Sequence, residues 1–182
     1  QKKSDSIGSK LLKIILENAF GYKYNDWTKL KICFLPEPVD EWASIIDNDG
    51  VTILEKFYGN SEKYAFPFQM MAYISRLNQI KKALSENYDI IFTERCVFTD
   101  RNVFAKMLYD DGKINEICYQ IYLKWFNDFI GDLPKHEFIY IKASPEKCME
   151  RIIKRNRTGE TIALDYLKNC CDYHDKMLSM HE

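Results

Sequence analysis

The stretch that decides the fold reads Asp89-Ile90-Ile91-Phe92-Thr93-Glu94-Arg95-Cys96-Val97-Phe98-Thr99-Asp100-Arg101. Its short apolar run, residues 90–92, ends in a carboxylate and a guanidinium, and a helical pattern begins directly after them. In an open parallel α/β sheet, ligands bind outside the carboxyl ends of the strands. A buried strand that delivers Glu94 and Arg95 to that edge is suited to hold a phosphate and a metal. A surface salt bridge at a strand end is the alternative interpretation.

Apolar periodicity along the rest of the chain predicts strands separated by helices. The expected strands are residues 29–35, 90–92 and 138–141. The expected helices are residues 10–20, about 42–46 followed by a short second helix before residue 58, then 66–84, 100–109, 114–130, one opened by Ser144-Pro145, and 164–177. Such an order implies an α/β fold with a parallel sheet and helices packed on it. Because no repeat, low-complexity tract or linker interrupts the pattern, residues 1–182 are expected to form a single domain.

The composition excludes several classes of function. The chain has 182 residues, of which 46% are apolar and 29% charged, and its net charge is -1, so we expect neither a polyanion-binding surface nor a nucleic-acid partner. Its six cysteines form no C-x-x-C motif and indicate a reducing compartment rather than a zinc site. Without a membrane-length apolar run or a signal peptide, no membrane partner is expected. The location expected is cytoplasmic, although an imported form without its targeting segment would have the same features.

Charged residues recur where a ligand would bind. Glu37 stands between two prolines at the end of the first predicted strand, which holds its carboxylate in a rigid setting. Arg76 interrupts an apolar helix, and because a buried guanidinium needs a partner, Asp100 is the candidate.

An arginine cluster precedes a glycine-containing polar break. Arg151 and Arg155 are four residues apart and share a helix face, and Arg157 follows them. Together they could form a movable clamp that neutralises a transferring phosphoryl group. A solvated basic face is the alternative.

These residues, in this order, resemble the deoxynucleoside kinase family over roughly residues 33–178. Those P-loop-fold enzymes phosphorylate the 5′-hydroxyl of deoxycytidine, deoxyadenosine, deoxyguanosine or thymidine. The resemblance rests on the order and spacing of several segments, which are Pro36-Glu37-Pro38-Val39 followed by Trp42 (E-P-V-x-x-W in the family), Phe68-Gln69 with Arg76 seven residues later, Glu94-Arg95-Cys96 (E-R-S), and Arg151-x-x-x-Arg155-x-Arg157-x-x-Glu160. It implies a P-loop kinase-like parallel sheet flanked by helices, with an Arg-rich lid at about residues 151–163.

The resemblance also implies a mechanism, which is direct in-line phosphoryl transfer from ATP or another nucleoside triphosphate. Glu37 would be the general base, Glu94 would serve Mg²⁺, and Arg95 would hold the 5′-oxygen and the phosphate. The lid arginines, Arg151, Arg155 and Arg157, would spread the transferring charge.

The nucleoside-binding residues implied in the same way are Trp42, Tyr58, Phe68, Gln69, Ala72, Arg76, Asp100, Phe104 and Glu160. Gln69, the Arg76/Asp100 pair and the small Ala72 resemble the base pocket of deoxycytidine and deoxyguanosine kinases. We therefore expect deoxycytidine or a purine deoxynucleoside as the substrate in preference to thymidine. Because the relatives are homodimers, a homodimer is expected here as well.

Two departures from the family concern the phosphate donor. The family's loop G-x-x-x-x-G-K-[ST] cradles donor phosphates, whereas this chain has only Ser6-Ile7-Gly8-Ser9-Lys10-Leu11. Gly8 and Lys10 are the candidate donor-binding residues, and an ordinary first-turn lysine is the alternative for Lys10. The family also continues beyond the position of Glu182. If the sequence is complete, donor binding should be weak or rebuilt; if residues are missing from it, an ordinary kinase is the simplest account.

Two other functions remain open at this point. A non-catalytic descendant of the family would bind a nucleoside or a partner protein, and the altered phosphate loop favours it. A nucleoside monophosphate kinase is less favoured, because Tyr58 and Glu160 resemble residues that contact the sugar of a nucleoside.

Overall fold

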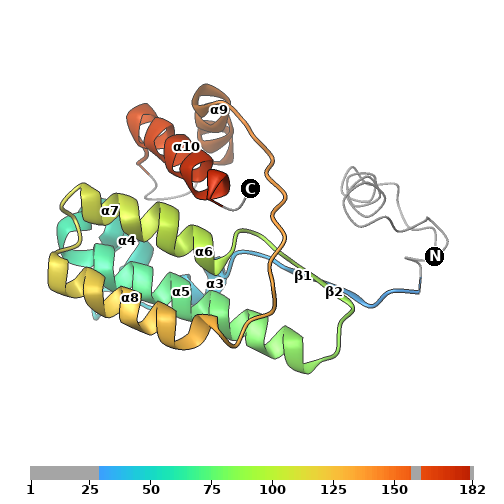
Figure 1. Ribbon diagram of the computed structural model, residues 1–182. Helices are drawn as coiled ribbons and strands as arrows, with labels where there is room; N and C mark the ends of the chain where they lie inside the picture. The colour runs from blue at the N-terminus through green and yellow to red at the C-terminus, as the bar shows by residue number, and fades with distance from the viewer. Residues whose placement is uncertain (1–28, 157–160, 181–182) are drawn as a thin grey trace.

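The computed structural model describes residues 29–156 and 161–180 of the chain (Figure 1). Its elements, in order, are β1 (Ile32–Leu35), α3 (Val39–Ala43), α4 (Ile53–Gly59), α5 (Ser61–Ser85), β2 (Ile90–Thr93), α6 (Val97–Thr99), the π-helix η1 (Asp100–Ala105), α7 (Lys106–Asp110), α8 (Glu116–Ile130), α9 (Pro145–Arg155) and α10 (Leu164–Ser179). The predicted helix at residues 10–20 lies outside the described residues.

The predicted parallel sheet is confirmed by β1 and β2. They pair in parallel, with Ile32 opposite Ile90 and Leu35 opposite Thr93. Directly after the ladder, the N–H of Glu94 donates to the carbonyl of Leu35 at 2.9 Å. Because the strands run in the same direction, the residues that follow each of them meet at one edge of the sheet. The fold therefore brings the segment around Glu37 next to Glu94.

The long helix α5 is the centre of the packing. Ten of its residues are buried, and six of these belong to two apolar clusters. One cluster joins α5 to α3 and α4 through Trp42 and Phe57, and the other joins it to α8 through Tyr122 and Phe126. In Figure 1 these helices lie beside the strands, whereas α9 and α10 lie above α6 and α7. The sheet is thus flanked by helices, as predicted.

Helix α5 begins five residues before the predicted start at Phe66. The Asn60 side chain accepts the N–H of Lys63 at 3.2 Å and caps the helix there. Pro67 lies inside the helix and leaves the carbonyl four residues earlier without its usual donor. Burial of Ala65 and Phe68 on either side of this proline favours the continuous helix.

The predicted strand at residues 138–141 is wrong. This segment is extended, but its backbone pairs with no described strand, and Ile141 is 67% exposed. Side chains fix it instead: the His136 ring lies edge-on to Phe98 with 5.1 Å between centroids, and Lys142 Nζ donates to Asp175 Oδ2 at 2.7 Å. The segment connects the α8 side of the molecule to α9 (Figure 1).

The helix predicted at residues 100–109 forms, but it begins with a π-helical turn, η1. Residues 97–110 are continuously helical through α6, η1 and α7. Such turns add one residue to a helix and are frequent at functional sites.

Within the described parts of the chain, no helix combines the length and the apolar character that crossing a membrane requires.

Candidate active site

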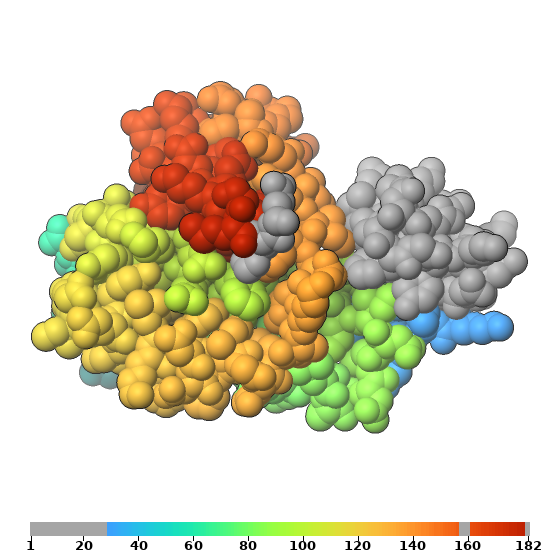
Figure 2. Space-filling model, viewed as in Figure 1, coloured from blue at the N-terminus to red at the C-terminus, as the bar shows by residue number. Residues whose placement is uncertain are grey.

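A cavity of about 450 Å³ opens at the carboxyl edge of the two strands. On one side it is lined by α4, α5 and η1, and on the other by residues 140–145, α9 and α10. Figure 2 shows α9 and α10, in orange and red, packed on top of the helical layer. Every described residue that the sequence assigned to a site lines this cavity except Glu94; those residues are Glu37, Trp42, Tyr58, Phe68, Gln69, Ala72, Arg76, Arg95, Asp100, Phe104, Arg151 and Arg155. Gly8, Lys10, Arg157 and Glu160 lie outside the described residues.

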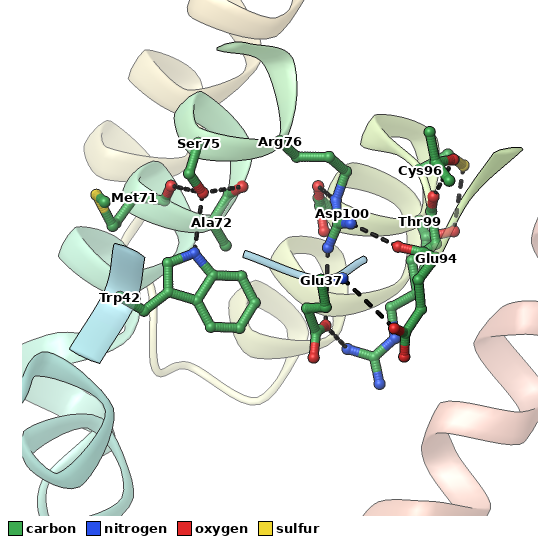
Figure 3. A network of polar contacts seen from close by, with 12 residues as sticks. Glu37, Trp42, Met71, Ala72, Ser75, Arg76, Glu94, Cys96, Thr99 and Asp100 are labelled. Carbon is green, nitrogen blue, oxygen red and sulfur yellow. Dashed lines mark hydrogen bonds and ion pairs between the residues drawn. The ribbon is translucent and has the colours of Figure 1, made fainter. Parts of the chain in front are cut away.

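Glu37 is held between two guanidinium groups. Arg95 Nη1 donates to Glu37 Oε1 at 2.6 Å, and Arg76 Nη2 lies 3.7 Å from the same oxygen (Figure 3). The Glu37 side chain is 13% exposed, so these interactions are only partly screened by water. The Glu37 carboxylate therefore has a defined position at the end of β1, facing the cavity.

Arg76 and Asp100 form the buried ion pair that the sequence predicted. Arg76 Nε donates to Asp100 Oδ2 at 2.8 Å, and Arg76 Nη1 donates to the carbonyl of Glu94 at 2.6 Å. Both side chains are 3% exposed. Burial alone would lower the pKa of Arg76, but the charge and hydrogen bond of Asp100 outweigh it and raise that pKa. Burial raises the pKa of Asp100, and the charge of Arg76 opposes this rise. We call Glu37, Arg76, Arg95 and Asp100 the charged floor.

Arg95 has an unusual backbone conformation. Its φ is +62°, in the left-handed region that residues other than glycine rarely adopt. Thr93 Oγ1 donates to the Arg95 carbonyl at 2.5 Å and stabilises this turn. The turn directs the Arg95 guanidinium both to Glu37 and over the Phe104 ring, 4.7 Å from its centroid. A strained conformation of this kind costs about 1–3 kcal/mol and is typical of functional sites.

Aromatic side chains form the apolar part of the cavity. Trp42 lies edge-on to Phe68, with centroids 5.3 Å apart, and Phe57 stacks on Phe68 at 4.8 Å. Trp42 Nε1 donates to Ser75 Oγ at 2.9 Å, so the indole is fixed to α5 (Figure 3). Gln69 lines the cavity beside them, and its side-chain amide forms no hydrogen bond with another described residue. A flat ligand could lie among these rings with a polar edge turned to Gln69.

The far side of the cavity includes residues to which the sequence had assigned no role. Tyr166, Cys170 and His174 lie four residues apart on one face of α10, and all three line the cavity. With Arg151 and Arg155 of α9 they form what we call the α9–α10 wall. The four-residue spacing was the available signal, but it also fits a helix packed on an ordinary core. Burial raises the pKa of the Cys170 thiol to about 11, so this thiol is protonated near neutral pH.

Glu94 is the candidate Mg²⁺ ligand. It is exposed at the carboxyl end of β2, and Glu94 Oε2 accepts the N–H of Glu37 at 3.4 Å. Among the residues described, no group of three or more His, Cys, Asp or Glu side chains could enclose a metal ion. Mg²⁺ in phosphoryl-transfer sites is commonly held by one or two carboxylates together with phosphates and water. A single exposed carboxylate at this edge fits that mode of binding.

Comparison with known proteins gives consistent matches. A family model described as deoxynucleoside kinase matches residues 12–182. The chain is 35% identical over 147 residues to a probable deoxycytidine kinase of Fowlpox virus, covering 79% of this chain and 60% of the viral protein. It is 32% identical over 166 residues to deoxycytidine kinase 2 of Gallus gallus, covering 79% and 63%. It is 29% identical over 203 aligned positions to deoxycytidine kinase of Bos taurus, covering 96% and 78%. The chain spans less than two thirds of the viral and chicken relatives.

Proposed function

Because the chain belongs to the deoxynucleoside kinase family, we propose that it transfers a phosphoryl group from a nucleoside triphosphate to the 5′-hydroxyl of a deoxynucleoside. The observation that carries this proposal is the charged floor, in which a carboxylate and a guanidinium meet at the strand ends beside an aromatic cavity. Its biological role would be nucleotide salvage.

Glu37 is the proposed general base. Its oxygen accepts from Arg95 and faces the cavity, so a 5′-hydroxyl bound there could transfer its proton to the carboxylate as the oxygen attacks phosphorus. Arg95 would then lie beside the oxygen that gains the phosphoryl group. The arginines of α9, together with Arg157, would offset the charge of that group during transfer.

We propose that the base is read by Gln69 and the Arg76–Asp100 pair, with Phe104 stacking on it. Gln69 offers both a donor and an acceptor, and the fixed ion pair adds a charged edge in a buried setting. This polar end, with the small Ala72 beside it, favours deoxycytidine or a purine deoxynucleoside. Trp42, Tyr58 and Phe68 would complete the walls around the base and sugar, and Glu160 would contact the sugar.

ATP is the proposed donor, with Gly8 and Lys10 at its phosphates. Glu94 would hold Mg²⁺ at the sheet edge, where the ion would neutralise charge on the donor phosphates. The deoxynucleoside site consists of described residues, and its binding can be measured independently of the donor.

The test is calorimetric titration of deoxycytidine, deoxyguanosine, deoxyadenosine and thymidine, followed by Mg-ATP, combined with a phosphoryl-transfer assay. Glu37→Gln should lower kcat by about 10²–10⁴-fold while nucleoside affinity stays within about threefold, because only the proton acceptor is lost. Glu41→Gln, an exposed change in α3 outside the cavity, is the matched control and should behave as the wild type. Nucleoside binding without phosphoryl transfer would overturn the proposed kinase activity and favour a non-catalytic nucleoside-binding protein. Failure to bind any of the four nucleosides would overturn both the kinase and the nucleoside-binding hypotheses.

We also propose a homodimer formed through α8. Ile117, Ile121 and Trp125 are spaced four residues apart on this helix and are 71%, 43% and 45% exposed. A stripe of this kind on a helix face is costly to leave in water and suits an identical partner helix. Replacing Ile117 and Ile121 with glutamate should halve the mass measured by light scattering. An unchanged mass, or a monomeric wild type, would contradict this interface.

A further inference from the structure

His174 connects the α9–α10 wall to the charged floor. It lies on α10, lines the cavity, and its ring stands edge-on to Phe104 with 6.0 Å between centroids and 83° between planes. On another side it lies parallel to Tyr140 at 6.2 Å. The other partner of Phe104 is Arg95, whose guanidinium lies over the ring at 4.7 Å. One phenyl ring therefore contacts both His174 and the arginine that binds Glu37.

The tautomer of His174 is fixed by its own helix. His174 Nδ1 lies 2.6 Å from the carbonyl oxygen of Cys170, and because a carbonyl can only accept, Nδ1 must carry the hydrogen. In the neutral ring, Nε2 is then an unprotonated acceptor on the side away from the helix backbone. No described residue donates to it.

The surroundings of His174 favour the neutral ring. Burial lowers its pKa, the hydrogen bond to Cys170 opposes this, and the charge of Arg95 lowers the pKa further. Asp175, the neighbour on its own helix, acts in the opposite direction but is paired with Lys142. Tyr140 and Cys170, the other titratable groups that face the ring, both have raised pKa values because of burial and are neutral near pH 7.

We propose that His174 is a positioning residue for Arg95, and this inference rests on the proposed function. The neutral imidazole supports Phe104 and offers Nε2 to the cavity, so the Arg95 guanidinium stays between Phe104 and Glu37. A protonated ring would instead place a second positive charge near Arg95, whose charge already acts on the His174 ring. Arg95 would then lose its position at the 5′-oxygen, and transfer would slow as the pH falls through the pKa of His174.

Two substitutions separate the charge of His174 from its shape. His174→Gln places an amide near the position of Nε2, but this amide cannot be protonated. At pH 7.5 its kcat should therefore stay within about threefold of the wild type. The decrease in kcat at low pH that protonation of His174 causes in the wild type should be absent from this variant. His174→Leu removes the acceptor and should lower kcat by about 10–100-fold with a smaller change in KM, as expected when a transition-state contact is misplaced. Tyr173→Phe, which removes a hydroxyl bonded to Asp110 outside the cavity, is the control and should keep the wild-type pH profile.

A second readout does not depend on activity. In NMR spectra, the Arg95 side-chain N–H signal should shift as His174 is titrated in the wild type and should not shift over that range in His174→Gln. If the Arg95 N–H signal does not shift as His174 is titrated, or if His174→Leu keeps the wild-type kcat and pH profile, the proposal is overturned. If Arg95 responds but the wild type transfers no phosphate, the coupling stands and the proposed function fails instead.

Discussion

The two sides of the cavity are built in different ways. The charged floor rests on α5, which has ten buried residues, and on the ion pair of Arg76 with Asp100. The opposite side rests on α9, an 11-residue helix with no buried residue, and on α10, in which only Met177 is buried. The floor is therefore fixed before a ligand arrives, whereas the α9–α10 wall is held by fewer contacts. Breaking the Arg76–Asp100 pair should therefore reduce stability, whereas changes in the wall should affect activity alone.

The largest effect is expected from Arg76→Met. It leaves Asp100 buried without a partner, which should reduce the free energy of unfolding by about 3–5 kcal/mol. Lys81→Met is the matched control on the same helix, because Lys81 pairs with Asp132 at the surface and should cost less than about 1 kcal/mol. Urea denaturation measures both. Equal losses for the two variants would remove the distinction between the floor and an ordinary surface.

The double variant Arg151→Gln/Arg155→Gln tests the wall. It should lower kcat by about 10²–10³-fold, since removing donors that face developing charge has effects of that size. Its free energy of unfolding should stay within about 0.5 kcal/mol of the wild type, because α9 has no buried residue. Lys154→Gln on the same helix lies outside the cavity and serves as the control for both measurements. A large loss of stability would show that α9 supports the fold.

Trp42→Phe is a smaller test of the α5 side of the cavity. It keeps most of the apolar contact with Phe68 but removes the hydrogen bond to Ser75, so the unfolding free energy should fall by about 1–2 kcal/mol. Ser75 Oγ still donates to the carbonyl of Met71 at 2.7 Å, which limits the loss. Glu41→Gln, an exposed change next to Trp42 on α3, is the control, with an expected change below about 0.5 kcal/mol. Calorimetric unfolding would show whether the two changes differ.

The smallest expected difference is in the hydrogen exchange of α5 and α9, which can be measured in the unmodified protein. Amide hydrogens in the middle of α5 should exchange about 10²-fold or more slowly than those of α9, because local opening of α9 exposes almost no buried apolar surface. Hydrogen exchange followed by mass spectrometry measures this. Similar protection in the two helices would mean that the wall is as rigid as the floor.

Much of the floor could be predicted from the sequence because its signals are local. The apolar run before Glu94 identified β2, and a guanidinium in the apolar helix identified the pair of Arg76 with Asp100. The roles of these residues in catalysis and binding stay predictions until activity is measured.

The errors concern features that depend on distant partners. Residues 138–141 have the apolar character of a strand, but a strand needs a neighbouring backbone, and none is supplied among the described residues. Helix α5 begins earlier than predicted because the Asn60 side chain caps it and the helix continues through Pro67. His174 was missed as a cavity residue because its significance comes from Phe104 and Arg95, which are far from it in the sequence.

In the π-helical turn η1, adding or removing one residue would change the directions in which the side chains before the turn point relative to those after it. Asp100 and Phe104, which face the cavity, lie inside this turn, whereas α7 continues after it with regular spacing. Each residue of an α-helix advances the side-chain direction by about 100°. Deleting one residue from η1 would therefore rotate the residues that precede it, back to Arg95, about the helix axis relative to α7. Insertions and deletions, more than substitutions, are the changes to which this part of the active site is most sensitive.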